Sequence, residues 1–146
     1  MTTAQFIAKT FNTRNDKWGR YGYERRCSSV FTDRDGNVYS YGYHYPLLFT
    51  IEGLTFINTT GYSSTTIRHI AWAKRAVGYS YIGVELNGAR LPITLDDIEA
   101  KLGAKVVELH SEMQAKKRKD TQVYKYLEQE YEQTLADYNR VKERNS

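Results

Sequence analysis

The spacing of apolar residues changes along this 146-residue chain, and each change predicts a different kind of element. Up to about residue 58, apolar and aromatic side chains tend to alternate with polar ones, as in strands with one buried face. From residue 67 to 77, and again after residue 94, apolar residues recur every three or four positions, which indicates helices. Short polar turns join the early segments, so we expect an antiparallel sheet. The predicted fold class is therefore α+β.

The first half of the chain predicts a series of short strands joined by turns. We place them at residues 3–11, 20–31, 38–45, 47–51, 54–58 and 79–86. Residues 33–37 predict a hairpin turn in which Gly36 adopts a positive φ. Every second residue from Tyr39 to Tyr45 is a tyrosine, and these four rings are therefore expected on one face of a strand.

Helical spacing divides the rest of the chain into one short helix and a long C-terminal segment. We predict a helix at residues 65–77, followed by Gly78 as its C-terminal stop. Thr94 and Asp97 resemble a capping pair, and the basic run at 116–120 interrupts two apolar stripes, with Asp120 or Thr121 as the next cap. We favour two antiparallel helices over one long helix.

Charge supports a division of the chain into two parts. Residues 1–92, the Tyr-rich sheet with helix 65–77, carry 11 Lys and Arg against 6 Asp and Glu. Residues 93–146 carry 10 against 11, and we interpret them as a helical extension of the same compact unit or as an oligomerisation arm. An anionic partner is therefore expected at the first part, although the overall charge is only +4.

Several functions have little support in the sequence. The three histidines are far apart, and the loop at 33–37 lacks the glutamate of a calcium site, so we expect no metal and no cofactor. Cys27 is the only cysteine, and a strand cysteine is more often a core residue than a nucleophile. We expect no enzymatic activity. With no apolar run of membrane-spanning length and no secretory signal, we predict a cytoplasmic protein that does not enter a membrane.

Two groups of residues remain as candidate ligand sites. The first interleaves arginines with tyrosines, a composition that suits stacked bases and phosphates. The second is a hydroxyl-rich loop that opens a helix, where free N–H groups and the helix dipole favour anions. The candidate residues are Arg20, Tyr21, Tyr23, Arg25, Tyr41 and Tyr43 in the first group, and Ser63, Ser64, Thr65, Thr66, Arg68 and His69 in the second.

Each group also has a plain structural interpretation. One face of the tyrosines can be core and the other an oligomer surface, and a single helix cap explains part of a Ser/Thr cluster. We expect the basic residues at 116–119 to be a solvated helix end rather than a nucleic-acid patch. The tyrosine and leucine stripe at 124–141 is typical of a core or dimer seam, so a homo-oligomer is expected.

The segments Tyr39–Phe49 and Asn58–Val77 resemble small accessory proteins of tailed bacteriophages, a family of unknown function. The resemblance covers roughly residues 5–80 and includes no catalytic motif, so it assigns no site residues. It implies a setting in the cytoplasm of an infected host cell, where such proteins often act on the host, including by inhibiting antiviral defence.

The sequence supports two hypotheses. In the first, the chain binds a phosphate-bearing ligand, either a nucleotide signal or a nucleic acid, without catalysis. In the second, it is a protein–protein inhibitor of a host protein or a structural homo-oligomer, because tyrosine is enriched at interfaces.

Overall fold

The protein has an α+β fold, as its apolar pattern predicts. The structure is a computed structural model that describes residues 1–13 and 26–146. The chain forms two compact units, Met1–Ile93 with the sheet and Thr94–Ser146 with two helices.

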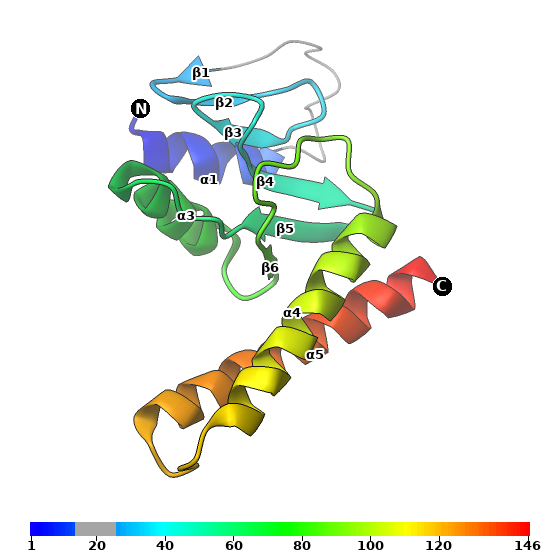
Figure 1. Ribbon diagram of the computed structural model, residues 1–146. Helices are drawn as coiled ribbons and strands as arrows, with labels where there is room; N and C mark the ends of the chain where they lie inside the picture. The colour runs from blue at the N-terminus through cyan, green and yellow to red at the C-terminus, as the bar shows by residue number, and fades with distance from the viewer. Residues whose placement is uncertain (14–25) are drawn as a thin grey trace. The chain divides into compact units, whose positions relative to one another are not determined.

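Within the described residues, six strands form one sheet in the order of the chain (Figure 1). The strands are β1 (Arg26–Cys27), β2 (Val30–Thr32), β3 (Val38–Ser40), β4 (Pro46–Ile51), β5 (Leu54–Asn58) and β6 (Ile82–Val84). Neighbours from β1 to β5 are antiparallel, whereas β6 runs parallel to β5. The sheet is therefore mixed and not wholly antiparallel as expected. A helix lies between β5 and β6, and this crossover lets β6 run in the same direction as β5.

The turn predictions in this sheet are confirmed. The Asp33 carboxylate accepts hydrogen bonds from the backbone N–H groups of Asp35 and Asn37, and Gly36 has a φ of 85°. Gly53 takes a positive φ between β4 and β5, which form a second hairpin at two of the predicted strands, 47–51 and 54–58.

The single strand predicted at residues 20–31 is wrong in its described part. Residues 26–31 instead contain β1, a turn and β2, with Cys27 paired to Val30 and Ser28 at a φ of 58°. Residues 20–25 lie outside the described residues.

The strand predicted at residues 3–11 is also wrong, because these residues form helix α1 (Thr3–Thr13). A capping box begins it: the Gln5 N–H donates to the Thr2 hydroxyl, and the Thr2 N–H donates to the Gln5 side chain. This Thr-x-x-Gln pattern is a sequence signal for a helix start. Phe6 and Ile7 are buried, as the inner face of such a helix requires.

Helix α3 (Ser64–Val77) confirms the helix predicted at 65–77 and ends at Gly78, whose φ is 80°. It packs against α1, and both helices cover the same face of the sheet (Figure 1). Ile70 and Ala73 of α3 belong to one core cluster with Phe6 of α1 and with strand residues such as Val38 and Ile57. Two helices rather than one therefore pack on the sheet.

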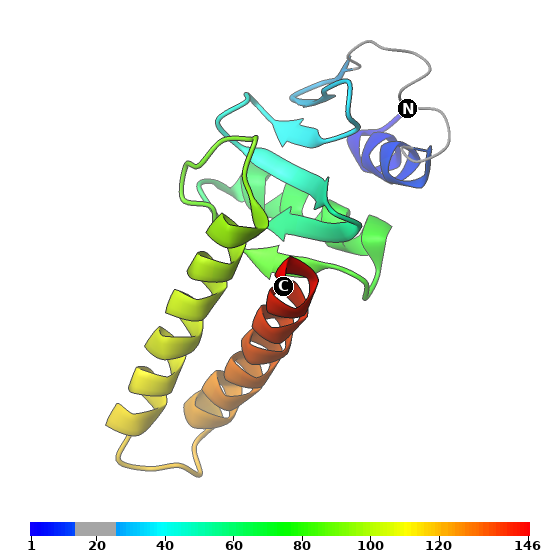
Figure 2. The same cartoon turned by 90° about the vertical axis from the view of Figure 1, so that its right-hand side faces the viewer.

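The second unit is a helical hairpin, as we favoured from the sequence, and not one long helix. Helix α4 (Leu95–Ala115) and helix α5 (Gln122–Asn145) pack antiparallel (Figure 2). Asn145 near the end of α5 donates a hydrogen bond of 2.6 Å to Asp96 in the first turn of α4. Closer to the connecting loop, the rings of His110 and Tyr131 lie 5.9 Å apart.

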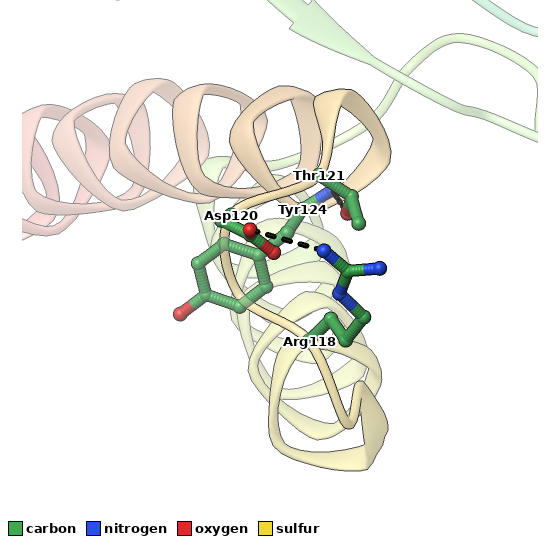
Figure 3. A network of polar contacts seen from close by, with 4 residues as sticks. All are labelled: Arg118, Asp120, Thr121 and Tyr124. Atoms are coloured by element: carbon green, nitrogen blue, oxygen red, sulfur yellow. Dashed lines mark hydrogen bonds and ion pairs between the residues drawn. The ribbon is translucent and has the colours of Figure 1, made fainter.

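Both predicted helix starts in this hairpin are confirmed. Thr94 and Asp97 form a reciprocal capping box at α4. Thr121 caps α5 by accepting a hydrogen bond from the Tyr124 N–H, and nearby Arg118 pairs with Asp120 at 3.2 Å in the connecting loop (Figure 3). The basic run therefore lies in an exposed turn between helices.

Candidate functional site

The four tyrosines from Tyr39 to Tyr45 do not share one face, so that prediction is wrong. Strand β3 ends at Ser40, and Tyr41 adopts a positive φ of 70°. The Gly42 N–H then donates to the Ser40 carbonyl, and the Tyr45 N–H donates to the Gly42 carbonyl. This tight loop breaks the period-two alternation, and it sends alternate tyrosines to opposite sides.

Tyr39 and Tyr43 belong to an aromatic cluster on the strands. The Phe31 and Tyr39 rings stack at 5.2 Å, Tyr43 meets both edge-on, and the Arg26 guanidinium lies 4.7 Å from the centre of the Phe31 ring. Phe31 and Tyr39 are buried, whereas Tyr43 is 45% exposed. Burial, together with a hydrogen bond to Asp33, raises the pKa of Tyr39. Of the three rings in this cluster, that of Tyr43 is the most exposed.

Tyr41 and Tyr45 lie on the side of α3. The hydroxyl of the buried Tyr45 donates a hydrogen bond shared between the backbone carbonyls of Asn58 and Thr60, and burial raises the pKa of Tyr45. Tyr41 is 55% exposed, and its ring centre lies 5.9 Å from that of His69. Tyr45 is therefore a structural residue, and Tyr41 is available at the surface.

Several polar groups of the hydroxyl-rich loop at 58–66 already form hydrogen bonds within the protein. The Asn58 side chain accepts hydrogen bonds from the N–H groups of Thr60 and Leu86. Ser63 is the N-cap of α3 and accepts from the Thr66 N–H, while the Ser63 and Thr66 hydroxyls lie 3.1 Å apart.

The four predicted hydroxyl residues therefore differ in what they can do. Ser63 and Thr66 hold the start of α3, and Thr66 is buried. Ser64 is exposed and Thr65 is partly exposed. Ser64 and Thr65 are the two that are placed to meet a ligand.

His69, a predicted ligand residue, does not add positive charge to the start of α3. Its side chain is buried, with Nδ1 2.7 Å from the Ser40 hydroxyl and with the Trp72 ring 5.7 Å away. Burial, and secondarily the charge of Arg68, lower the pKa of the imidazole. A group with an ordinary pKa near 6.5 that is lowered further is neutral at pH 7. His69 connects α3 to β3.

The exposed side of α3 carries the charge instead. Arg68, Lys74 and Arg75 are exposed, and we call these three residues the α3 cationic face. Helix α3 contains no acidic residue, nor does α1, whose Lys9 is also exposed. Within residues 1–13 and 26–146, no ion pair involves any residue of the α3 cationic face.

The structure thus brings Tyr41 next to His69, two residues from groups that the sequence treated as separate. Sequence reasoning missed Trp72, Lys74 and Arg75 as candidates. A signal for Trp72 and Arg75 was available, because they follow Arg68 at i+4 and i+7 and must share one side of a helix with it; Lys74, at i+6, does not follow this spacing. Arg20, Tyr21, Tyr23 and Arg25 lie outside the described residues.

Other site types and known proteins add no candidate. In the described part of the chain, no three metal-binding side chains come together, and no helix has the length and apolar character to cross a membrane. No protein-family model, curated protein or solved structure matches this chain. Its function is therefore inferred from its own geometry and charge.

Proposed function

We propose that this protein is a non-catalytic binder of a phosphate-bearing ligand, a nucleotide signal or a nucleic acid, and that the ligand contacts the α3 cationic face. The observation that carries the proposal is the presence of three exposed cations on one helix without an acidic residue on that helix. Surfaces of folded proteins usually intersperse both signs of charge.

The spacing of these charges explains why an anion would bind there. Arg68 and Arg75 are seven residues apart, which is about 10 Å along a helix. This distance exceeds the Debye length at physiological salt, ~8 Å, so the repulsion between the two arginines is largely screened there and acts mainly at low salt. A phosphate group relieves this repulsion, and arginine can hold it with two parallel hydrogen bonds.

The start of α3 supports the same proposal. The helix dipole places partial positive charge at Ser64 and Thr65, one turn before Arg68. Ser64 is exposed, and its hydroxyl can donate to a phosphate oxygen. This contribution is secondary, because Ser63 already caps the helix.

Binding of labelled oligonucleotides and of cyclic nucleotides, measured by fluorescence anisotropy at 50 mM salt, tests the proposal. The triple variant Arg68→Gln, Lys74→Gln, Arg75→Gln should bind at least about tenfold more weakly and should lose most of the salt dependence. The matched control is Lys116→Gln, Lys117→Gln, Lys125→Gln, which removes the same charge from the helical hairpin.

The control should bind like the unchanged protein, because its lysines lie in another unit. Equal losses in the two triple variants would mean that net charge, and not the α3 cationic face, governs binding. Absence of binding by the unchanged protein at low salt would refute the proposal outright.

A second candidate function, assembly into a homo-oligomer, is favoured by the surface of the helical hairpin. Val107, Val123 and Tyr126 are apolar or aromatic, yet they are 66%, 58% and 65% exposed. We propose that a second copy covers them. Sedimentation should show a dimer that Val123→Lys converts to a monomer, and a monomeric unchanged protein would refute this. The phage setting, the inhibition of host defence and a host protein partner remain predictions.

A further inference from the structure

An aromatic ring lies between two arginines along one side of α3, and the binding of a phosphate group by the charges does not explain why a ring is there. Trp72 lies one turn after Arg68 and one turn before Arg75, and it is partly exposed. The centre of the His69 ring lies 5.7 Å from that of Trp72 and 5.9 Å from that of Tyr41, so His69 lies between two more accessible rings, and it directly follows Arg68 in the chain. We call Tyr41, His69 and Trp72 the ring row.

The members of the ring row differ in what they offer. His69 is buried and bonded to Ser40, so it spaces the other two rings and cannot itself stack on a ligand. Tyr41 is 55% exposed and held by its backbone, whose N–H donates a hydrogen bond of 2.7 Å to the Ser29 carbonyl. Tyr41 is therefore an accessible aromatic ring with a fixed backbone, and its neighbour His69 directly follows the exposed Arg68 in the chain.

We propose that the phosphate-bearing ligand is single-stranded nucleic acid, with its backbone on the α3 cationic face and an unpaired base on Tyr41. This inference rests on the proposed phosphate-binding function. Side chains on the outside of a helix diverge, so one phosphate group reaches few of the three cations. A strand presents several phosphates along the ~10 Å between Arg68 and Arg75.

The ring row favours a single strand over a duplex. In a duplex the faces of the bases are covered by their neighbours, and only the edges of base pairs reach the grooves. In a single strand the faces are free, and stacking on aromatic side chains between cationic contacts is the usual mode of binding without sequence preference. An exposed Tyr41 ring beside the start of α3 is useful for binding a single strand and not for binding a duplex.

The first test compares ligands on the unchanged protein. A ten-nucleotide single strand should bind more tightly than the same sequence as a duplex and much more tightly than a mononucleotide. The slope of log K against log salt should be about −2, as expected for three phosphate contacts with a single strand.

The second test removes the ring of Tyr41 without changing its backbone. Tyr41 has a φ of 70°, and asparagine tolerates this left-handed region better than most residues. Tyr41→Asn should weaken single-strand binding by about 5- to 150-fold, the range for loss of one stacked base. Tyr41→Phe keeps the ring and should bind like the unchanged protein. A thermal unfolding curve for each variant separates lost contacts from lost folding.

The outcomes separate this inference from the proposed function. If a mononucleotide or a duplex binds as tightly as the single strand, and the arginine variants weaken it, phosphate binding stands and the single-strand inference is wrong. Equal affinities of folded Tyr41→Asn and Tyr41→Phe would also contradict the inference. Failure of all three ligands to bind at 50 mM salt would overturn both proposals.

Discussion

The hydrogen bond between Ser40 and His69 connects β3 to α3, and its removal gives a prediction of defined size. The Ser40 hydroxyl and Nδ1 of His69 are 2.7 Å apart, and both side chains are buried. In Ser40→Ala, the ring nitrogen loses its partner at a place that water reaches poorly. Leaving a buried polar atom unsatisfied costs about 1–3 kcal/mol, so we expect this decrease in the free energy of unfolding.

Urea denaturation at pH 8, where the imidazole is neutral in both states, measures the effect. Ser64→Ala is the matched control, because Ser64 is exposed and lies at the start of the same helix, and it should change stability by less than about 0.5 kcal/mol. The double variant Ser40→Ala, His69→Phe should be more stable than the sum of the single effects predicts, because no polar atom is then stranded. Equal stability of Ser40→Ala and the unchanged protein would refute the reasoning.

His69 also predicts how the free energy of unfolding changes with pH. Burial lowers the pKa of His69 in the folded protein, so the unfolded chain binds a proton more readily. The stabilisation is complete above the ordinary pKa of about 6.5 and is lost as the pH falls through 6.5 toward the lowered value. His69→Phe should therefore reduce the fall in stability between pH 8 and pH 5.

Three further predictions concern the backbone and the hairpin. Gly78→Ala should destabilise by about 1–3 kcal/mol in urea, because the φ of 80° strains any side chain although no atom lies near the added carbon. Thr94→Ala should cost about 1 kcal/mol by calorimetry, because it removes the N-cap of α4. Burial raises the pKa of Asp137, whose stabilisation is thus present at low pH and lost as the pH rises through the raised value. Asp137→Asn should therefore gain stability relative to the unchanged protein at pH 7 and little at pH 3, by thermal unfolding.

Local signals account for the parts of the fold that the sequence predicts well. The sequence indicates a helix stop at Gly78 and helix starts at Thr94 and Thr121, and the structure has all three there. The turn at 33–37 is set by one aspartate and one glycine a few residues apart. These features depend on hydrogen bonds within about five residues, so the residue types in a short segment are enough to predict them.

The sequence pattern was misleading in two places, at α1 and at the tyrosines after β3. The Thr2 and Gln5 pattern marks the start of α1, but alternating apolar residues nearby favoured a strand. The tyrosines from Tyr39 to Tyr45 alternate as in a strand, yet Tyr41 takes a left-handed conformation and the chain turns. Periodicity alone cannot detect such a turn, because tyrosine is not a residue that usually marks one.

The candidate site could be predicted only in part, because its members are distant in sequence. Arg68 and the spacing to Trp72 and Arg75 are visible in the sequence of one helix. The approach of Tyr41 to His69 depends on how β3 packs under α3, a contact across 28 residues. Burial of His69, which removes its charge, also depends on that packing.

The central claim is that a phosphate-bearing ligand contacts α3, and backbone amide chemical shifts during a titration test it most directly. A ten-nucleotide single strand should shift the signals of Tyr41, Arg68, Trp72 and Arg75 most strongly, with saturation at one set of sites. Shifts confined to the hairpin loop at 116–120, or no shifts at 50 mM salt, would contradict the claim.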